Sequence, residues 1–254
     1  MIAQYQSGMS ASEILKSVPF KTTKTVYDVL AKHAIPKRRP HGLQDYKCFH
    51  ETIFANIDTP AKAYWLGILI TDGYVIDSRE HCEPQIGLEL IDSGLVEKFR
   101  TFLGVENPVL VMNRGRSELH KPMYRVTVYS RRMAEDLGKY GVVPRKTFTT
   151  YLPILTPDLM PHLLRGILDG DGTVSRRADG EVIMGYCGNE RLVIEIRMWL
   201  ISRLGVSDNK VHRNGSISFI QWSARSDVEK LGRYLYQGAE VYLERKFALI
   251  EEYL

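Results

Sequence analysis

The sequence predicts an α+β fold made of two similar halves, each with the element order αββαββα, preceded by a small all-α module. Three observations lead to this prediction. An apolar helical segment that ends in Asp-Gly occurs twice, segments with the alternating pattern of strands follow each copy, and basic residues gather near the N-terminus. Because both halves repeat one order of elements, we expect a pseudo-twofold relation between them.

The repeated segment covers residues 65–73 (WLGILITDG) and residues 164–172 (LRGILDGDG). Each copy holds one internal glycine, Gly67 or Gly166, although a glycine inside a helix costs about 0.5–1 kcal/mol relative to alanine. That cost is offset where the missing side chain lets two backbones approach closely. We therefore predict that the two helices pack on each other at these glycines, which would bring their Asp-Gly ends together.

Asp72 and Asp171 supply the carboxylates at these two ends. Two carboxylates held close together repel each other unless a cation lies between them. Hard oxygen ligands suit Mg²⁺, and carboxylate pairs with divalent metals recur in enzymes that cleave phosphodiesters. One copy would more often be a buried helix with a capping turn, but two copies with matching flanks favour a shared metal site.

Both copies are also expected to start alike. Thr59-Pro60 and Thr156-Pro157 each have the pattern of an N-cap followed by proline at the first helical position. The sequence therefore predicts that the two helices begin at Pro60 and Pro157.

Alternating and amphipathic patterns define the remaining elements. After the first copy we expect strands at 74–79 and 85–91, a helix at 94–103 capped by Asp92, strands at 109–112 and 124–129, and a helix at 131–140. After the second copy we expect strands at 173–177 and 181–187, a helix at 190–204, strands at 210–213 and 216–222 joined through Asn214-Gly215, and a helix at 226–235.

Composition limits the class of protein. The chain has 254 residues, 44% of them hydrophobic, with no apolar run long enough to span a membrane and no signal-peptide pattern. Cys48, Cys82 and Cys187 are widely spaced and are expected to be free thiols, and no zinc-ligand spacing occurs. The expected free thiols and the lack of a membrane span predict a cytoplasmic protein.

The N-terminal segment carries most of the excess positive charge. Residues 1–50 hold eight of the 34 Lys/Arg and three of the 30 Asp/Glu, whereas the remainder is nearly balanced. A short helix is expected within residues 8–18, where Ser10 and Glu13 have the spacing of a capping box, and a second at 22–33, after a tight turn. The pair resembles a helix-turn-helix DNA reader of the kind attached to resolvases and phage endonucleases. This resemblance implies a protein of prokaryotic or phage origin that associates with DNA. The expected organisation is a helix-turn-helix module at 1–36, a basic linker at 37–50, and two half-domains at 51–152 and 153–254.

The two Asp-Gly segments resemble the motif of LAGLIDADG homing endonucleases in their two-motif, single-chain form. Ile70 departs from that motif, which has its first Asp there, but the last Asp is present in both copies. The resemblance covers roughly residues 50 to 254. It implies two four-stranded antiparallel sheets that form a saddle over duplex DNA, and Mg²⁺-dependent double-strand breaks with short 3′ overhangs.

The resemblance also implies roles for individual residues. Asp72 and Asp171 would bind Mg²⁺ jointly, with Mn²⁺ or Ca²⁺ able to replace it in a crystal. The backbone carbonyls of the preceding residues, Thr71 and Gly170, would add ligands. A lysine in each half would stabilise the phosphate transition state or organise water, and the matching positions are Lys146 and Lys246.

Double-stranded DNA is the expected partner of a monomeric protein with no membrane and no small-molecule substrate. A two-stranded ribbon fits the major groove of B-DNA, so basic and polar residues on the outward faces of the strands are candidate DNA contacts. The candidates are Lys21, Thr22, Thr23, Lys24 and Tyr27 in the N-terminal module, Arg38 and Arg39 in the linker, and Arg79, Arg114, Arg116, Arg125, Arg176, Arg177, Lys210, Arg213 and Gln221 in the two halves.

Two other functions remain open on the sequence. A transcription regulator could combine the helix-turn-helix with a body that no longer cuts DNA, but such a body usually loses the motif acids, and both are present here. An RNA maturase could use the same fold to aid intron splicing, but the DNA-type module at the N-terminus weighs against it.

Overall fold

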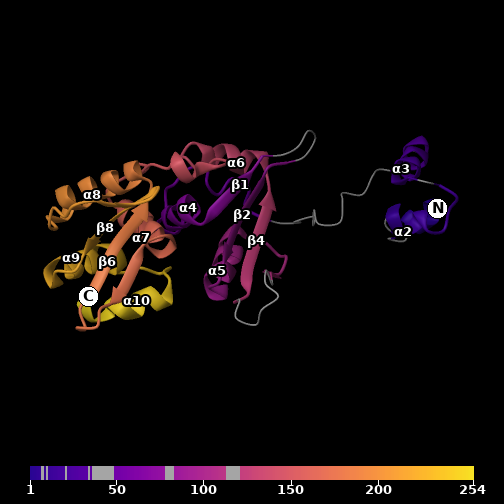
Figure 1. Ribbon diagram of the computed structural model, residues 1–254. Helices are drawn as coiled ribbons and strands as arrows, with labels where there is room; N and C mark the ends of the chain where they lie inside the picture. Colours follow the sequence, from indigo (N-terminus) through magenta and orange to yellow (C-terminus); the bar gives the residue numbers. More distant parts are fainter. Residues whose placement is uncertain are drawn as a thin grey trace. The chain divides into compact units, whose positions relative to one another are not determined.

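The computed structural model describes residues 1–6, 9, 11–20, 22–33, 35, 49–77, 83–112 and 121–254. The chain divides into two compact units, Met1–Asp45 and Tyr46–Leu254 (Figure 1). Within the described residues, no helix has the length and apolar character needed to cross a membrane.

The N-terminal unit contains three helices, α1 (Ile2–Gln6), α2 (Ala11–Leu15) and α3 (Thr23–Lys32). They share a small core of five buried side chains, namely Tyr5, Ala11, Ile14, Val26 and Leu30. Helix α1 was not expected from the sequence. The connection between α2 and α3 spans residues 16–22, so it is longer than the expected tight turn and than the three or four residues usual in a helix-turn-helix.

The first half of the larger unit has the predicted order of elements. They are α4 (Pro60–Thr71), β1 (Gly73–Ile76), β2 (Gln85–Leu90), α5 (Ser93–Leu103), β3 (Leu110–Met112), β4 (Met123–Tyr129) and α6 (Arg131–Gly138). The four strands form one antiparallel sheet in the order β1-β2-β4-β3.

The second half repeats this order after a short 3₁₀ turn, η1 (Lys146–Phe148). Its elements are α7 (Met160–Gly170), β5 (Thr173–Arg176), β6 (Val182–Gly188), α8 (Glu190–Leu204), β7 (His212–Asn214), β8 (Ile217–Trp222) and α9 (Arg225–Tyr236), followed by α10 (Glu244–Ile250) and η2 (Glu251–Tyr253). The sheet order is β5-β6-β8-β7, again antiparallel. The predicted α+β architecture with two four-stranded antiparallel sheets is therefore confirmed.

Helices cover one face of each sheet. Side chains alternate between the two faces of a strand, so the apolar residues of each strand gather on the covered face. Ile86 and Leu88 of β2 are buried with Val126 and Val128 of β4 on the covered face of the first sheet. Helices α4 and α7 pack against each other between the two sheets, as Figure 1 shows. One continuous hydrophobic core therefore joins the two halves.

Two local predictions were wrong in position. Helix α4 begins at Pro60, with Thr59 accepting a bond from the Lys62 backbone nitrogen, but α7 begins at Met160, not at Pro157. The Thr156 carbonyl closes a turn by accepting from the backbone nitrogens of residues 159 and 160. The second-half hairpin also turns one residue later than expected: Asn214 pairs with Ile217, which leaves residues 215 and 216 as the loop.

Candidate active site

Helices α4 and α7 cross at two glycines. A β-carbon placed on Gly67 would lie 2.3 Å from the carbonyl oxygen of Leu163, and one placed on Gly166 would lie 2.1 Å from that of Tyr64. Real β-carbons do not approach other atoms this closely, and the obstructing atoms belong to backbone that cannot swing away. The crossing therefore requires glycine in both helices.

The helices remain close at their carboxyl ends. A β-carbon on Gly170 would lie 2.0 Å from Thr71 Oγ1 and 2.8 Å from Asp72 Oδ2. Asp72 and Asp171 are the residues that directly follow α4 and α7 as their C-caps. The structure thus brings the two motif carboxylates to the same place at the centre of the larger unit.

The carboxylates at this place are poorly solvated. Burial, and next the charge of Asp171, raises the pKa of Asp72 from 3.8 to about 6. Burial also raises the pKa of Asp171, while Lys146 and Lys246 act in the opposite direction. Burial and mutual repulsion make the ionised forms of these carboxylates unfavourable. A cation bound between them would stabilise the ionised forms, so the site favours a bound cation.

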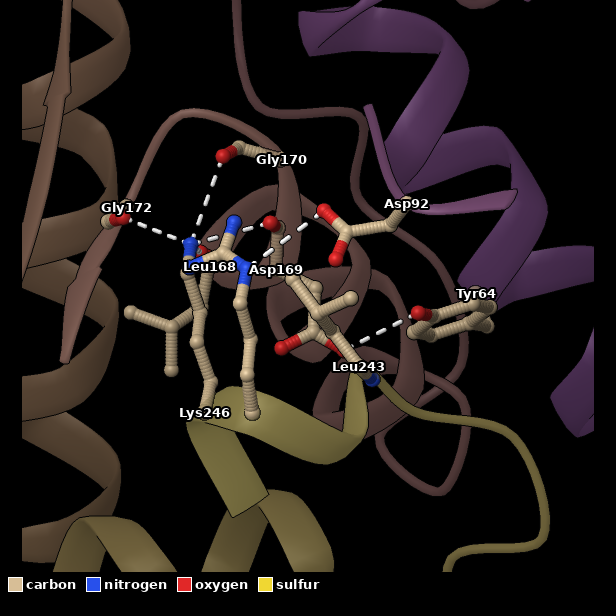
Figure 2. Close-up of polar contacts among 9 residues, drawn as sticks. Tyr64, Asp92, Leu168, Asp169, Gly170, Gly172, Leu243 and Lys246 are labelled. Atoms are coloured by element: carbon tan, nitrogen blue, oxygen red, sulfur yellow. Dashed lines mark hydrogen bonds and ion pairs between the residues drawn. The ribbon is translucent and has the colours of Figure 1, made fainter. Parts of the chain in front are cut away.

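Lys146 contacts the end of α4, and Lys246 contacts the end of α7. Lys146, in η1, is 9% exposed and its Nζ donates to the Thr71 carbonyl at 2.8 Å. Lys246, in α10, is 3% exposed, and its Nζ donates to four carbonyls at the end of α7 (Figure 2). These are the carbonyls of Leu168 at 2.6 Å, Asp169 at 2.9 Å, Gly170 at 3.3 Å and Gly172 at 2.6 Å. Burial lowers the pKa of both lysines, that of Lys246 to about 8.

A cavity flanks each carboxylate. One, of about 210 Å³, lies beside Asp171 and is lined among others by Lys146 and Cys187. The other, also about 210 Å³, lies beside Asp72 and is lined among others by Glu89 and Arg245. The two cavities give access to the carboxylates from both halves.

Sequence reasoning missed two residues next to the carboxylates. The Cys187 thiol donates to the Asp171 carbonyl at 2.7 Å, and Glu89 lines the cavity beside Asp72. Cys187 and Glu89 occupy equivalent positions in β6 and β2. Each lies two residues after the glycine, Gly185 or Gly87, that pairs with the strand following the motif. The sequence did hold a signal for them: in the alternating pattern of these strands, both residues stand at positions that face away from the core.

The donor atoms at the centre suit a hard divalent cation. The described part of the chain holds no group of three or more His, Cys, Asp or Glu side chains that could bind a metal. The groups that could hold such an ion are the carboxylates of Asp72 and Asp171, with the adjacent carbonyls of Thr71 and Gly170 and with water. Such an all-oxygen set is the kind that Mg²⁺ prefers.

Some candidate DNA contacts lie on the sheet face opposite the helices. Arg125 does so in β4, where its Nη2 lies 2.5 Å from Glu89 Oε2. Glu89 and Arg125 line a shallow cavity of about 380 Å³ on the same face. Gln221 is exposed on the corresponding face of β8, and Arg177 is exposed just after β5, with its Nε 3.3 Å from Asp179. Lys210 is exposed but precedes β7 instead of lying in it.

Two candidates, Arg176 and Arg213, do not lie on that face. Arg176 pairs in register with Val182, and Arg213 with Ser218, and both partners are buried on the helix-covered side. The Arg176 guanidinium donates instead to Glu252 at 2.6 Å. The prediction that these two residues face outward was wrong, because a residue and its register partner in an antiparallel pair lie on the same face of the sheet.

The remaining candidates belong to the N-terminal unit or lie outside the described residues. Thr23, Lys24 and Tyr27 lie in α3, and Thr22 is its N-cap. The candidates outside the described residues are Lys21, Arg38, Arg39, Arg79, Arg114 and Arg116.

Comparison with known proteins identifies the fold. No protein-family model matches the sequence, and a search of curated proteins gives no match. Among solved structures, the homing endonuclease I-WcaI bound to its DNA recognition sequence is similar with a TM-score of 0.57 and 13% identity, over 85% of this chain and 97% of that one. The LAGLIDADG meganuclease I-AabMI bound to uncleaved DNA has a TM-score of 0.51 and 14% identity, over 77% and 89%. A mutant of I-SmaMI has a TM-score of 0.52 and 12% identity, also over 77% and 89%. The larger unit therefore has the fold of the LAGLIDADG homing endonucleases.

Proposed function

We propose that this protein is a LAGLIDADG-type homing endonuclease that makes Mg²⁺-dependent double-strand breaks in duplex DNA, with short 3′ overhangs. The observation that carries the proposal is the meeting of Asp72 and Asp171 at the joined ends of α4 and α7. The fold that this chain shares with endonucleases solved on DNA supports the proposal. The poor solvation of the two acids supports it as well, because a bound cation would stabilise their charged forms.

The two acids and the neighbouring carbonyls would hold the metal. Asp72 and Asp171 would supply one carboxylate each, and Thr71 and Gly170 would supply backbone oxygens. Bound Mg²⁺ would neutralise charge on the phosphate and activate water for hydrolysis. The chain itself contributes the pre-arrangement: the glycine crossing fixes the two acids in place before DNA binds, so little ordering is left for the reaction.

Lys146 and Lys246 would face the negative charge that develops on the phosphate. Both side chains are held at the helix ends by backbone carbonyls, and both are nearly excluded from water. A positive charge in such a place acts more strongly on a nearby phosphate than one in bulk solvent. The two lysines are therefore the side chains that would stabilise the transition state, one for each half.

DNA would lie along the sheet faces opposite the helices. Arg125 and Gln221 lie on these faces, one in each half. The N-terminal unit would add a second contact through α3, with Lys24 and Tyr27 among its half-exposed or exposed residues. The basic excess near the N-terminus supports this, because such charge adds affinity for phosphates irrespective of sequence.

A cleavage selection tests the proposal. The protein is incubated with a random duplex library and Mg²⁺, the cut ends are sequenced, and the recovered site is then cut in parallel by wild type, Asp72→Asn and Asp171→Asn. We expect double-strand breaks by wild type, and loss of double-strand cleavage with DNA binding retained in both variants. A variant that still cuts both strands at the wild-type rate would overturn the assignment of the two acids.

Binding measurements beside the cleavage assay, with the duplex library and with structured intron RNA, separate the other two functions. Sequence-specific binding of duplex DNA without cleavage in Mg²⁺ or Mn²⁺ would overturn the nuclease in favour of a regulator. Tighter binding of structured intron RNA than of any recovered duplex would overturn it in favour of a maturase.

A further inference from the structure

Asp169 is a fully buried carboxylate that none of the proposed chemistry uses. Its side chain is 2% exposed, and both of its oxygens accept hydrogen bonds. Oδ2 accepts from the Tyr64 hydroxyl at 2.9 Å and from the Leu243 backbone nitrogen at 2.8 Å, and Oδ1 accepts from the Tyr236 hydroxyl at 2.7 Å. A carboxylate is seldom buried unless its partners are specific, so these three donors define a built site.

The three donors come from three different elements. Tyr64 lies in α4 of the first half, Tyr236 lies in α9, and Leu243 is the N-cap of α10. Asp169 itself lies in the last turn of α7. One side chain therefore connects the two motif helices with the beginning of α10.

Lys246 lies in the first turn of α10, three residues after Leu243. Its Nζ reaches the carbonyls of Asp169 and Gly170 among others, as Figure 2 shows. The Asp169 side chain thus holds the start of α10, and the Asp169 backbone receives the lysine that α10 carries. A shift of the Leu243 backbone by even part of a turn would move Lys246 relative to the end of α7.

Exposed ion pairs also connect this turn to the first half. Arg245 Nε lies 3.4 Å from Asp92 Oδ2, and Glu244 pairs with Lys98. Such solvent-exposed pairs contribute little to rigidity. The buried network around Asp169 is therefore the main constraint on where α10 begins.

The first half has a different arrangement at the matching position. Ile70, which is apolar and 2% exposed, stands in the first motif where Asp169 stands in the second. Within the described residues, Lys146 Nζ has one hydrogen-bond partner, the Thr71 carbonyl. Its neighbour Arg145 has φ 58, the left-handed conformation that is rare for residues other than glycine. The two lysines are therefore held in unequal ways.

We propose that Asp169 is a positioning residue that fixes Lys246 through the start of α10, which makes the two half-sites of this enzyme unequal. The inference rests on the proposed nuclease function. It assigns Tyr64 and Tyr236 a share in the same task, because each donates to Asp169. Disturbing this network should affect the strand whose cleavage depends on Lys246, and leave the other strand nearly unchanged.

Strand-resolved cleavage of a duplex labelled on both strands tests this directly. Lys246→Met and Lys146→Met first establish which strand depends on which lysine. Tyr64→Phe removes the hydroxyl that donates to Asp169 but keeps the ring and its contact with the Arg165 guanidinium. We expect it to slow cleavage of the Lys246-dependent strand about tenfold, the size of effect that loss of a hydrogen bond to a charged group can have. Asp169→Asn should act on the same strand, and nicked DNA should accumulate.

Tyr186→Phe is the matched control. Like Tyr64, Tyr186 is buried. Its hydroxyl also donates to α7, the helix that holds Asp169, but it does so at the Leu164 carbonyl and not at the Asp169 side chain. We expect this variant to lose some stability and to keep the wild-type ratio of the two strand rates. Equal slowing of both strands by Tyr64→Phe and Asp169→Asn, or no slowing by either, would overturn the proposal.

A second readout does not require DNA cleavage. In the metal-free protein, acetylation of each lysine by a limiting amount of an acylating reagent is followed by mass spectrometry. We expect Tyr64→Phe and Asp169→Asn to raise the acetylation rate of Lys246 at least several-fold, with Lys146 and the Tyr186→Phe control unchanged. An unchanged rate at Lys246 in both variants would overturn the positioning role. A raised rate in a protein that cuts no DNA would keep the positioning role and reject the nuclease.

Discussion

Gly67 and Gly166 face each other across the crossing of α4 and α7, where a β-carbon on Gly67 would lie 2.9 Å from the Cα of Gly166. This contact between two glycines nearly a hundred residues apart sets the distance between the helices. It also sets the separation of Asp72 and Asp171, because each follows one of these helices directly.

We expect Gly67→Ala to lower the free energy of unfolding by about 3 kcal/mol or more, the upper end of what overpacking costs, because the obstructing atoms are backbone. Denaturant unfolding measures the change. Gly94→Ala is the control, since Gly94 lies in α5 with nothing within 4 Å of the added carbon, and it should gain about 0.5–1 kcal/mol. Equal stability of the two variants would show that the close crossing does not exist.

The raised pKa of Asp72 makes the stability of the metal-free protein depend on pH. Between pH 3.8, the ordinary pKa, and pH 6 the folded protein binds more protons at Asp72 than the unfolded chain does. The free energy of unfolding should therefore fall as pH rises through this window, by up to about 3 kcal/mol from this group. Unfolding in EDTA at a series of pH values measures the fall.

Asp72→Asn should reduce that fall and be more stable than wild type at pH 7. Asp58→Asn is the comparison, because Asp58 is an exposed carboxylate whose hydrogen bond with Lys62 lowers its pKa. It should leave the decline between pH 3.8 and 6 in place. Identical pH profiles for wild type and Asp72→Asn would contradict the burial and repulsion described at the site.

Glu89 neutralises Arg125 on the sheet face that would meet DNA. We expect Glu89→Gln to tighten binding to duplex DNA and to steepen the dependence of log K on log salt by about one unit, since one more cation can replace a counterion. Fluorescence anisotropy over a salt series gives both quantities. Glu229→Gln, which frees Arg225 in an exposed pair on α9, should change neither; a steeper slope there as well would point to a general charge effect.

Removal of residues 1–45 should leave the larger unit folded, because each of the two units has its own core. The shortened protein should bind duplex DNA more weakly, with a shallower salt dependence, since the missing segment carries seven Lys/Arg against three Asp/Glu. Its cleavage rate at saturating DNA should stay the same. Undiminished affinity would reject a DNA-binding role for the N-terminal unit.

Local pattern was enough to predict much of this fold. Residues 65–73 and 164–172 repeat a helix with one glycine and a terminal Asp-Gly, and the alternation in segments such as 85–90 fixes which side chains of a strand share a face. These signals lie within a few residues of each other, so they survive in the sequence without knowledge of the packing. They predicted the element order of both halves, whereas the two four-stranded antiparallel sheets were implied by the family resemblance.

The start of α7 and the direction of Arg176 could not be predicted in the same way. Thr156-Pro157 has the pattern of a helix start, yet the Thr156 carbonyl closes a turn and α7 begins only at Met160. Arg176 was grouped with outward residues by charge, whereas its register with Val182 turns it toward Glu252. At Thr156-Pro157, packing outweighs a capping preference worth only about 1 kcal/mol. At Arg176, the strand register decides which face the side chain takes.

The sequence by itself determined the repeat, the two glycines, the two acids and the order of the strands. Only the tertiary structure decided that Lys246 lies on the end of α7, and that Tyr64 donates to Asp169 from a position 105 residues away in the chain. The physical reason is that periodicity and capping act over one or two turns of backbone. A hydrogen bond between distant elements depends instead on how whole helices pack, and no short-range pattern records that.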